Sequence, residues 1–314
     1  MNGYDIVFTG SAILDSIIKG FDPEPVSSAG YRAESGSLNA GGEAVNGSIA
    51  AAKLGLKPAI LCYLGEDAAG GMIESELRRN GVALDCIVRE KDHPTPVTTI
   101  FVAEDGNRRS ITNSAHKYNF HPERHAELLD GAKAIVIGSF FRAPFNNPEV
   151  ISSVVKQAAA KGLTIFADTK IPNFRRLTLD DIADSLPYVD YMTPNEDEGR
   201  FFTGEEEPDR MADVLLEKGV RNVIIKLGGR GCFFKNSEGS IFLPAFSVDV
   251  VDATGAGDNF LAGFASEIIR GSSVKDALLF ANACGAICST AVGSGTALKS
   301  REQVLVQLEK MEMR

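Results

Sequence analysis

The chain has 314 residues, 44% of them apolar, so it is long enough to bury a large hydrophobic core. Its 42 acidic and 32 basic residues give a formal net charge of -10, which disfavours general nucleic-acid binding because such binding depends on neutralising phosphates. No apolar run reaches the roughly 18–20 residues of a membrane span, and neither a polybasic segment nor a signal peptide is recognisable. The five cysteines show no metal-type CxxC spacing, so we expect reduced thiols in a cytoplasmic protein.

Short apolar runs alternate with longer amphipathic segments along the chain. The runs predict strands at Ile6–Phe8, Ala59–Leu64, Ala134–Ile137, Leu163–Ala167, Tyr188–Met192 and Asn222–Leu227. Helices are predicted at Glu43–Leu54, Gly71–Arg79, Pro148–Lys161, Asp209–Glu217 and, at the end, Leu298–Met313. Continuous apolar strands are typical of parallel sheets covered on both faces, so the alternation predicts a doubly wound α/β fold with a mostly parallel sheet.

Two segments interrupt this alternation. Thr98–Val102 and Arg109–Thr112 are β-rich and are joined by a polar turn that contains glycine, which indicates a hairpin. The stretch Asp22–Asn39 is rich in Gly, Ser and Pro and fits neither a long helix nor a core strand. We therefore expect one domain over residues 1–314, with a small β-sheet lid contributed by segments near 13–40 and 91–117.

The most informative stretch is Val251–Phe260, with the sequence VDATGAGDNF. A strand-like segment, Ser247–Val251, precedes it and a helical pattern follows, so its glycine-rich turn opens a helix. Backbone N–H groups at a helix start are unpaired and attract anions, as in a phosphate cradle. Asp258 lies beside this cradle and can accept a proton from an attacking hydroxyl during phosphoryl transfer. On local grounds, a plain glycine-rich turn with an aspartate helix cap is an equally good explanation.

The stretch resembles the DxTGAGD signature of the ribokinase-like, or PfkB, sugar kinases. The matching residues are Asp252, Thr254, Gly255, Ala256, Gly257 and Asp258. Gly41–Gly55 resembles the family's GGxxxNxAxxxxxLG signature, with Ser48 in place of an alanine. Asn195–Glu198, Lys226–Gly231 and Phe280–Ala283 resemble three further family motifs, and all five occur in the family's order.

The resemblance implies an ATP-dependent kinase that phosphorylates a hydroxyl of a small sugar. It makes Asp258 the general base and assigns the stabilisation of the phosphoryl group to the N–H groups of Gly255, Ala256 and Gly257. It implies sugar contacts at Asp15, Gly41, Gly42 and Asn46, with Arg109 of the predicted hairpin over them. It implies ATP contacts at Asn195, Lys226, Gly228, Gly231 and Asn282.

The resemblance also implies cofactors and partners. Mg²⁺ is expected near Glu198 through bridging waters. On local grounds a solvated acidic helix start explains Glu196–Glu198 better, and the resemblance reverses that preference. Asp252 resembles part of a K⁺ site. The partners expected are a sugar and ATP, with no nucleic acid and no membrane. Exposed lid strands favour a homodimer formed through the lid.

The sequence departs from the family pattern on the acceptor side. Glu43 replaces a lysine, and Ser139 stands where ribokinases place a glutamate; both changes disfavour ribose. Ser139, with Asp168 and Arg175 downstream, resembles the fructokinase and ketodeoxygluconate kinase branches. Phe140 and Phe141 can stack on a nucleobase, so a nucleoside remains an alternative acceptor.

Two further classes of function compete with a kinase. A non-catalytic sugar-binding relative would be expected to have lost Asp258 or its neighbouring glycines, and all of these are present. A dinucleotide-dependent dehydrogenase would need GxGxxG after the first strand, where Gly10-Ser11-Ala12 stands instead.

Overall fold

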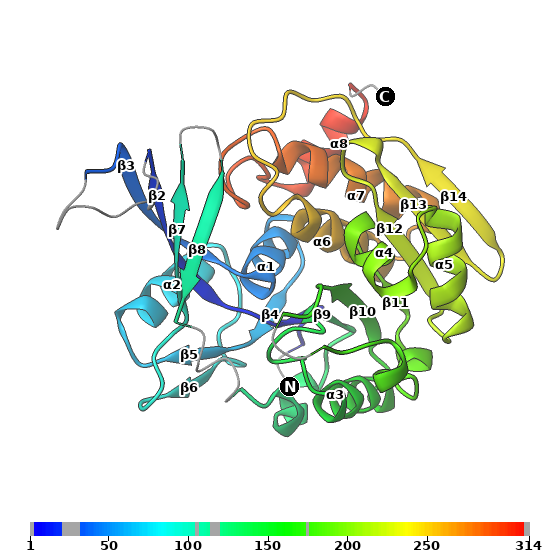
Figure 1. Cartoon of the computed structure of the whole chain (residues 1–314), viewed down its shortest axis with the longest axis horizontal. Coiled ribbons are helices and arrows are strands. Elements are labelled where there is room, and N and C mark those ends of the chain that lie inside the picture. The colour runs from blue at the N-terminus through cyan, green and yellow to red at the C-terminus, as the bar shows by residue number, and fades with distance from the viewer. Residues whose placement is uncertain (1–2, 21–31, 104–106, 114–119, 174–175, 311–314) are drawn as a thin grey trace.

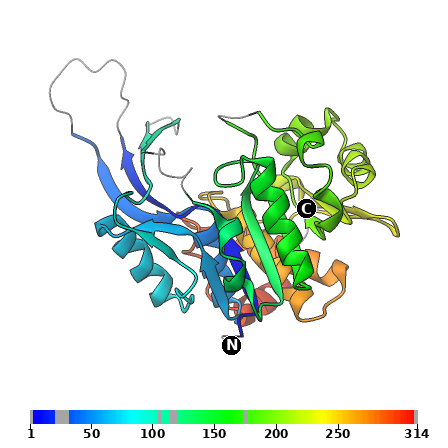
Figure 2. The same ribbon diagram turned by 90° about the horizontal axis from the view of Figure 1, so that it is seen from below.

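The computed structural model describes residues 3–20, 32–103, 107–113, 120–173 and 176–310. The predicted fold class is confirmed. A large, mostly parallel sheet is covered by helices on both faces, and a smaller separate sheet stands beside it (Figure 1). Seen from below, the small sheet projects from one side of the main body (Figure 2).

The large sheet has eight strands in the order β14-β13-β12-β11-β10-β9-β1-β4. The strands from β4 to β12 run parallel, and β13 and β14 are antiparallel additions at one edge. In the register of the sheet, Ile6 of β1 lies between Pro58 of β4 and Ala134 of β9. The strands are β1 Ile6–Thr9, β4 Pro58–Leu61, β9 Ala134–Phe140, β10 Thr164–Thr169, β11 Tyr191–Met192, β12 Asn222–Lys226, β13 Cys232–Asn236 and β14 Gly239–Leu243.

Successive side chains of the buried strands point to opposite faces of the sheet, so the core consists of one cluster on each face. Ile6 and Phe8 of β1 face a cluster that includes α1, α6 and α7, whereas Val7 faces the cluster under α3 and α5. Both faces of the sheet are therefore covered, which explains why its strands read as continuous apolar runs. The helices are α1 Glu43–Lys53, α2 Ala68–Arg79, α3 Pro148–Ala160, α4 Glu196–Thr203, α5 Pro208–Glu217, α6 Ala256–Ile269, α7 Val274–Cys288 and α8 Arg301–Leu308.

The smaller sheet has four strands in the order β3-β2-β7-β8. Its hairpin of β7 and β8 is antiparallel, as predicted, with Thr98 opposite Thr112. The strands are β2 Ile13–Lys19, β3 Ser35–Gly41, β7 Val97–Val102 and β8 Arg108–Thr112, and a separate parallel pair is formed by β5 Tyr63–Gly65 and β6 Val88–Glu90. Parts of the predicted lid, residues 21–31, 104–106 and 114–117, lie outside the described residues.

Some predicted elements differ from the structure. Ser247–Val251 is not a strand but a connection from the sheet edge to α6, and Val251 is 60% exposed because no ladder partner covers it. The predicted strand Tyr188–Met192 shortens to β11 because Leu186–Tyr188 forms a 3₁₀ turn. The last helix begins only at Arg301, where the Ser300 side chain caps it by accepting from the Gln303 N–H.

Candidate active site

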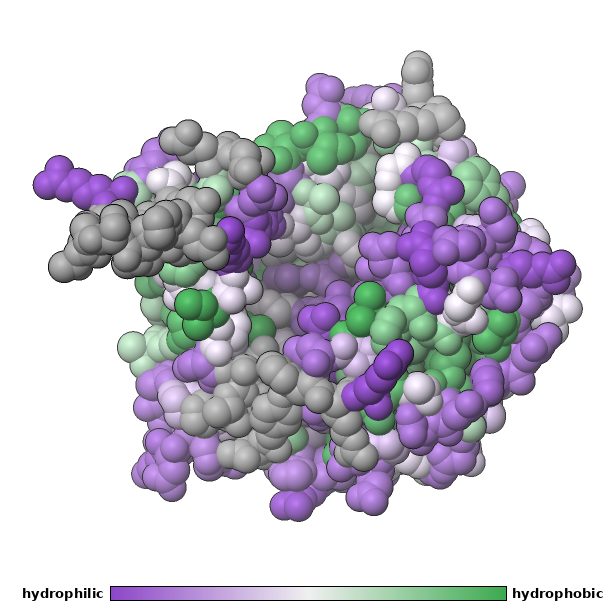
Figure 3. Space-filling model, viewed as in Figure 1, coloured by the Kyte–Doolittle hydropathy of each residue, from purple (hydrophilic) through white to green (hydrophobic). Residues whose placement is uncertain are grey.

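The candidate site lies where the large sheet presents the carboxyl ends of its parallel strands, the usual ligand site of open α/β sheets. Ser139, Asp168 and Lys226 lie at or near the ends of β9, β10 and β12. The first turns of α1 and α6 meet there, because Asn46 of α1 contacts Asp258 of α6. In the surface view, this face is hollowed between the small sheet and the main body (Figure 3).

A glycine in the left-handed region starts α6. Gly255 is the N-cap residue with φ of 77°, and a Cβ on it would lie 2.2 Å from the Ser294 Cβ. Both the backbone conformation and the close contact therefore require glycine here. Ala256 and Gly257 follow as the first helical residues. The Ala256 N–H donates to the Ala253 carbonyl at 3.2 Å, whereas the Gly257 N–H has no partner within α6 and can bind an anion.

Asp258 is held by one of its two carboxylate oxygens. Its Oδ2 accepts a hydrogen bond from Asn46 Nδ2 at 2.8 Å, and Asn46 Oδ1 in turn accepts from Ser294 Oγ at 2.7 Å. Its Oδ1 accepts from none of the described residues. Burial raises the pKa of Asp258 to about 7, and the charges of Glu43 and Asp168 act in the same direction. A carboxylate with one oxygen anchored, the other available and a pKa near neutrality is suited to take a proton.

Lys170 completes the charge distribution around Asp258. Burial acts to lower its pKa, but the carboxylates of Asp168, Glu43, Asp258 and Glu198 outweigh burial and raise it well above its usual value. Lys170 is therefore an ammonium group, and the nearest carboxylate oxygen, Oδ2 of Asp168, is 3.8 Å from its Nζ. Lys170 was not predicted from the sequence; the available signal was its place directly after a strand that ends at the carboxyl edge.

A buried ion pair lies behind this group. Asp168, 2% exposed, accepts from Lys226 Nζ at 2.5 Å and from Thr193 Oγ1 at 3.0 Å. Burial alone would raise the pKa of Asp168, yet Lys226 and Lys170 lower it below its usual value. A Cβ on Gly257 would lie 3.5 Å from the Lys226 Nζ, so this lysine connects the pair to the start of α6.

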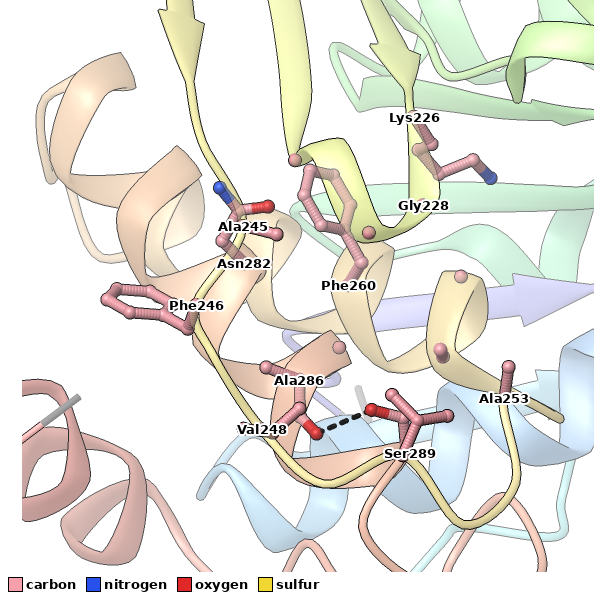
Figure 4. A pocket seen from close by; sticks show the side chains of 16 residues that line it. Lys226, Gly228, Ala245, Phe246, Val248, Ala253, Phe260, Asn282, Ala286 and Ser289 are labelled. Atoms are coloured by element: carbon pink, nitrogen blue, oxygen red, sulfur yellow. Dashed lines mark hydrogen bonds between the residues drawn. The ribbon is translucent and has the colours of Figure 1, made fainter. Parts of the chain in front are cut away.

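Next to Lys226 opens a cavity of about 250 Å³ (Figure 4). Its walls are mainly apolar and come from the connection after β14 and from α6 and α7, with Phe246, Val248 and Phe260 prominent. Three of the predicted ATP contacts, Gly228, Gly231 and Asn282, line it together with Lys226. Size and lining suit the base and sugar of a nucleotide.

Asn282 and Gly231, two of these predicted nucleotide contacts, also stabilise the local structure. The Asn282 Nδ2 donates to the Pro244 carbonyl at 3.3 Å, which ties α7 to the wall of the cavity. Gly231 has φ of 102°, and a Cβ on it would lie 2.0 Å from the Leu243 carbonyl oxygen. The chain can therefore turn here only with glycine.

Asn195 and Glu198 form a capping box at the start of α4. The Asn195 side chain accepts from the Glu198 N–H at 2.9 Å, and Glu198 Oε2 accepts from the Asn195 N–H at 2.9 Å. Glu198 Oε2 also accepts from Thr169 Oγ1, and burial raises the pKa of Glu198. These residues do form an acidic helix start, but Glu198 is 4% exposed and is therefore not solvated as that alternative requires. The described residues contain no group of three or more ligating side chains, but Mg²⁺ usually takes only one or two carboxylates besides phosphates and waters. The carboxylates of Glu198 and Asp168 fit that requirement.

Asp252, the predicted K⁺ ligand, is surrounded by donors. Its oxygens accept from the Thr254 N–H and Oγ1 and from the Gly293 N–H, at 2.7 to 3.0 Å. Arg108 of β8 adds a contact at 3.5 Å and also donates to Thr254 Oγ1 at 3.1 Å. Despite its partial burial, these donors lower the pKa of Asp252 to about 2. With four protein donors, the Asp252 carboxylate links neighbouring loops by hydrogen bonds and does not fit a K⁺ site.

The same contacts add Arg108, which was not predicted from the sequence, to the lid. Arg108 is a residue of β8 that contacts the DxTGAGD segment, and the role of Arg109 over the acceptor stays a prediction. Arg109 is its neighbour on the strand, and successive side chains of a strand point to opposite faces.

On the acceptor side, the remaining predicted residues are packed closely. A Cβ on Gly41 would lie 2.3 Å from Asp15 Oδ2, and a Cβ on Gly42 would lie 2.3 Å from the Ser11 carbonyl oxygen. Asp15 and Gly41 therefore lie side by side where β2 and β3 meet the main body. Phe140 and Phe141, considered as stacking platforms for a nucleobase, are fully buried in the core, so that interpretation is wrong.

Asp258 predicts the pH dependence of the reaction. If Asp258 must be ionised, kcat/KM for the acceptor should fall tenfold per pH unit below about pH 7. Glu43 raises the pKa of Asp258, and Lys170 lowers it. Glu43→Gln should therefore move this fall in kcat/KM to lower pH, and Lys170→Met should move it to higher pH. Initial-rate pH profiles of the three proteins would check this, and shifts in the reversed directions would contradict it.

Comparisons with known proteins agree with this geometry. The chain is 31% identical over 268 residues to the 2-dehydro-3-deoxygluconokinase of Bacillus subtilis, which covers 81% of each protein. It is 26% identical over 275 residues to the ribokinase of Haemophilus influenzae, covering 86% of this chain and 87% of that protein.

Solved structures give the same result. The structure of Arabidopsis thaliana ribokinase complexed with ribose and ATP superimposes with a TM-score of 0.85 at 25% identity, over 98% of this chain and 99% of that one. No described helix is long and apolar enough to cross a membrane. The family model described as pfkB family carbohydrate kinase matches residues 5–301, and the chain therefore belongs to the pfkB family of carbohydrate kinases.

Proposed function

We propose that this kinase transfers the terminal phosphoryl group of ATP directly to a hydroxyl of a small sugar, with Asp258 as the general base. The observation that carries the proposal is the available Oδ1 of Asp258, in the first turn of α6 and next to the N–H group of Gly257. Substrates of fructose, ribose or 2-keto-3-deoxy sugar acid type belong to this class.

The chemistry is a single displacement. Asp258 Oδ1 takes the proton of the acceptor hydroxyl, the acceptor oxygen forms a bond to the γ-phosphorus, and the bond from that phosphorus to the leaving ADP oxygen breaks. The N–H groups of Gly255, Ala256 and Gly257 stabilise the charge on the transferring group, and such donors are each worth about 3 kcal/mol in other enzymes. No covalent enzyme intermediate is needed.

The other residues position ATP and the acceptor. The cavity lined by Phe246 and Phe260 takes the nucleotide base, and Lys226 contacts the phosphates. When Mg²⁺ is bound near Glu198 and Asp168, it neutralises charge on the phosphates. Asp15, Gly41, Gly42 and Asn46 hold the acceptor, and the four-stranded sheet acts as a lid that excludes water.

K⁺ is expected to have little effect on the rate. Because Arg108 and three other donors already engage Asp252, replacing K⁺ by tetramethylammonium at equal ionic strength should change kcat less than about twofold. Steady-state rates in the two salts measure this. A large loss of rate without K⁺ would show that a cation competes with Arg108 for Asp252.

A homodimer through the lid is also proposed. Leu38 on β3 and Ile111 on β8 are 53% and 70% exposed, and exposed strands at a sheet edge favour pairing with another chain. Light scattering after gel filtration should give twice the chain mass of 33.5 kDa, and Ile111→Lys should reduce it toward the monomer.

The proposed function is tested by ADP release. ATP and Mg²⁺ are offered with a panel of ketoses, aldoses, sugar acids and nucleosides. Strong ADP release with one sugar supports the proposal. Release only with a nucleoside would make the protein a nucleoside kinase, and tight sugar binding without ADP release would make it a non-catalytic relative.

A further inference from the structure

Glu43 lies where the acceptor side meets the general base. It is the first residue of α1, directly after Gly42, and it is half-buried. A Cβ on Gly138 would lie 3.0 Å from the Glu43 Cβ, so Glu43 packs over the end of β9. Its charge acts on both Asp258 and Lys170, which places its carboxylate near both groups.

One oxygen of the Glu43 carboxylate is held and the other is available. Oε2 accepts from Ser139 Oγ at 2.7 Å, and Ser139 Oγ lies 3.1 Å from Ser11 Oγ. Ser139 is 1% exposed, so these two contacts hold its hydroxyl away from solvent. Oε1 accepts from none of the described residues. Ser11 lines a small cavity together with Tyr63 and Phe120, so this chain of polar groups reaches an open space.

The charges around Glu43 disfavour an anionic acceptor. Four carboxylates gather here: Asp258, Glu43, Asp168 and Glu198 all act on Lys170. The ammonium group of Lys226 is already paired with Asp168. Among these groups, four carboxylates face the two ammonium groups of Lys170 and Lys226, so negative charge exceeds positive charge.

Resting on the proposed function, we infer that Glu43 is a specificity-determining residue whose Oε1 accepts a hydrogen bond from an acceptor hydroxyl close to the one that is phosphorylated. The acceptor is accordingly an uncharged sugar and not a sugar acid. An ionised carboxylate can only accept hydrogen bonds, so the group that faces Oε1 must be a donor. A sugar carboxylate at the same place would meet like charge without a donor.

The first test compares acceptors of matched size. We would measure kcat/KM for fructose, ribose and glucose and for gluconate and 2-dehydro-3-deoxygluconate, using wild-type protein, Glu43→Gln and Glu43→Lys. Wild-type protein should prefer the best neutral sugar over the best acid by at least about tenfold. Glu43→Gln should raise KM for that sugar about 10- to 100-fold, since hydrogen bonds to charged groups are the stronger ones. Glu43→Lys should shift the ratio toward the acids.

A second test identifies the hydroxyl. Monodeoxy analogues of the best sugar are offered to wild-type protein and to Glu43→Gln. With wild-type protein, one deoxy analogue should have a kcat/KM lower than that of the parent sugar, by about the same factor as Glu43→Gln lowers kcat/KM for the parent sugar. With Glu43→Gln, kcat/KM for that analogue should be no lower than for the parent sugar. Glu217→Gln on the exposed side of α5 is the matched control, and thermal unfolding shows whether each variant is folded.

The outcomes separate this inference from the proposed function. Higher kcat/KM for an acid in wild-type protein, or unchanged kinetics of Glu43→Gln with every sugar, overturns the role of Glu43 while the kinase stands. No ADP release with any acceptor overturns the proposed function. In that case, calorimetric titration of the same sugars still tests Glu43, because weaker binding to Glu43→Gln supports the inference and equal binding overturns it.

Discussion

Replacing Asp258 by asparagine should lower kcat by about 10³-fold while ATP still binds. Asparagine keeps the shape of the side chain and can still contact Asn46, but it cannot take a proton from the acceptor hydroxyl. The nucleotide cavity and the N–H groups of Ala256 and Gly257 are untouched, so the Kd for ATP should stay within about threefold. Initial rates and nucleotide titration of the purified variant measure both effects.

A matched control separates the role of this carboxylate from a general effect of charge removal. Asp184 is 66% exposed and pairs with Lys156 on the surface, so Asp184→Asn should keep wild-type rates. If Asp258→Asn keeps more than about a tenth of the wild-type kcat, Asp258 is not the base.

The same variant should be more stable than wild-type protein at neutral and alkaline pH. The pKa of Asp258 rises from 3.8 to about 7 on folding, so ionising it disfavours the folded state. That cost begins above about pH 4, grows up to about pH 7 and stays constant beyond. Asp258→Asn removes it, so its gain in Tm should be largest near pH 8 and should shrink toward pH 4. An equal Tm difference at both pH values would contradict this linkage.

Replacing Lys226 by methionine should have the second large effect, on both stability and catalysis. Asp168 is 2% exposed, and removing one partner of a buried ion pair costs about 3–5 kcal/mol. Lys170 and Thr193 still contact Asp168, so we expect the lower end of this range. Loss of a cation beside the start of α6 should lower kcat/KM for ATP by about 10²-fold. Denaturant unfolding and steady-state kinetics measure the two effects.

The double variant Lys226→Met/Asp168→Asn distinguishes structure from catalysis. With the buried charge gone, most of the free energy of unfolding should return, because the remaining asparagine can still bond to Thr193. The kinetic defect should persist, since no ammonium group faces the phosphates. Recovery of kcat/KM in the double variant would reduce Lys226 to a structural partner of Asp168.

Local sequence was sufficient for the parts of this protein that depend on neighbouring residues. Continuous apolar runs indicated a parallel sheet, and the polar turn between Val102 and Arg108 indicated the lid hairpin. The glycine at position 255 and the aspartate three residues later marked the start of α6 as an anion site. In each case, the signal lies within one turn or one strand, where backbone geometry dictates residue type.

Ser247–Val251 shows where local sequence misled. Its three valines favour a strand, but the segment runs from the edge of the sheet to α6 and forms no ladder with a described strand. Arg108 was missed for a similar reason. Which of two adjacent strand residues faces the site depends on strand register, and register depends on the rest of the sheet.

By itself, the sequence determined the fold class, the nucleotide-side glycines and Asp258 as the candidate base, because these follow from periodicity and from short motifs. Only the tertiary structure brought Glu43, Lys170, Asp168 and Asp258 into one electrostatic group, since they come from α1, β10 with the residue after it, and α6. The pKa of Asp258 and the excess of carboxylates around Lys170 arise from burial and from charges that are distant in sequence. Such properties exist only once the chain has packed.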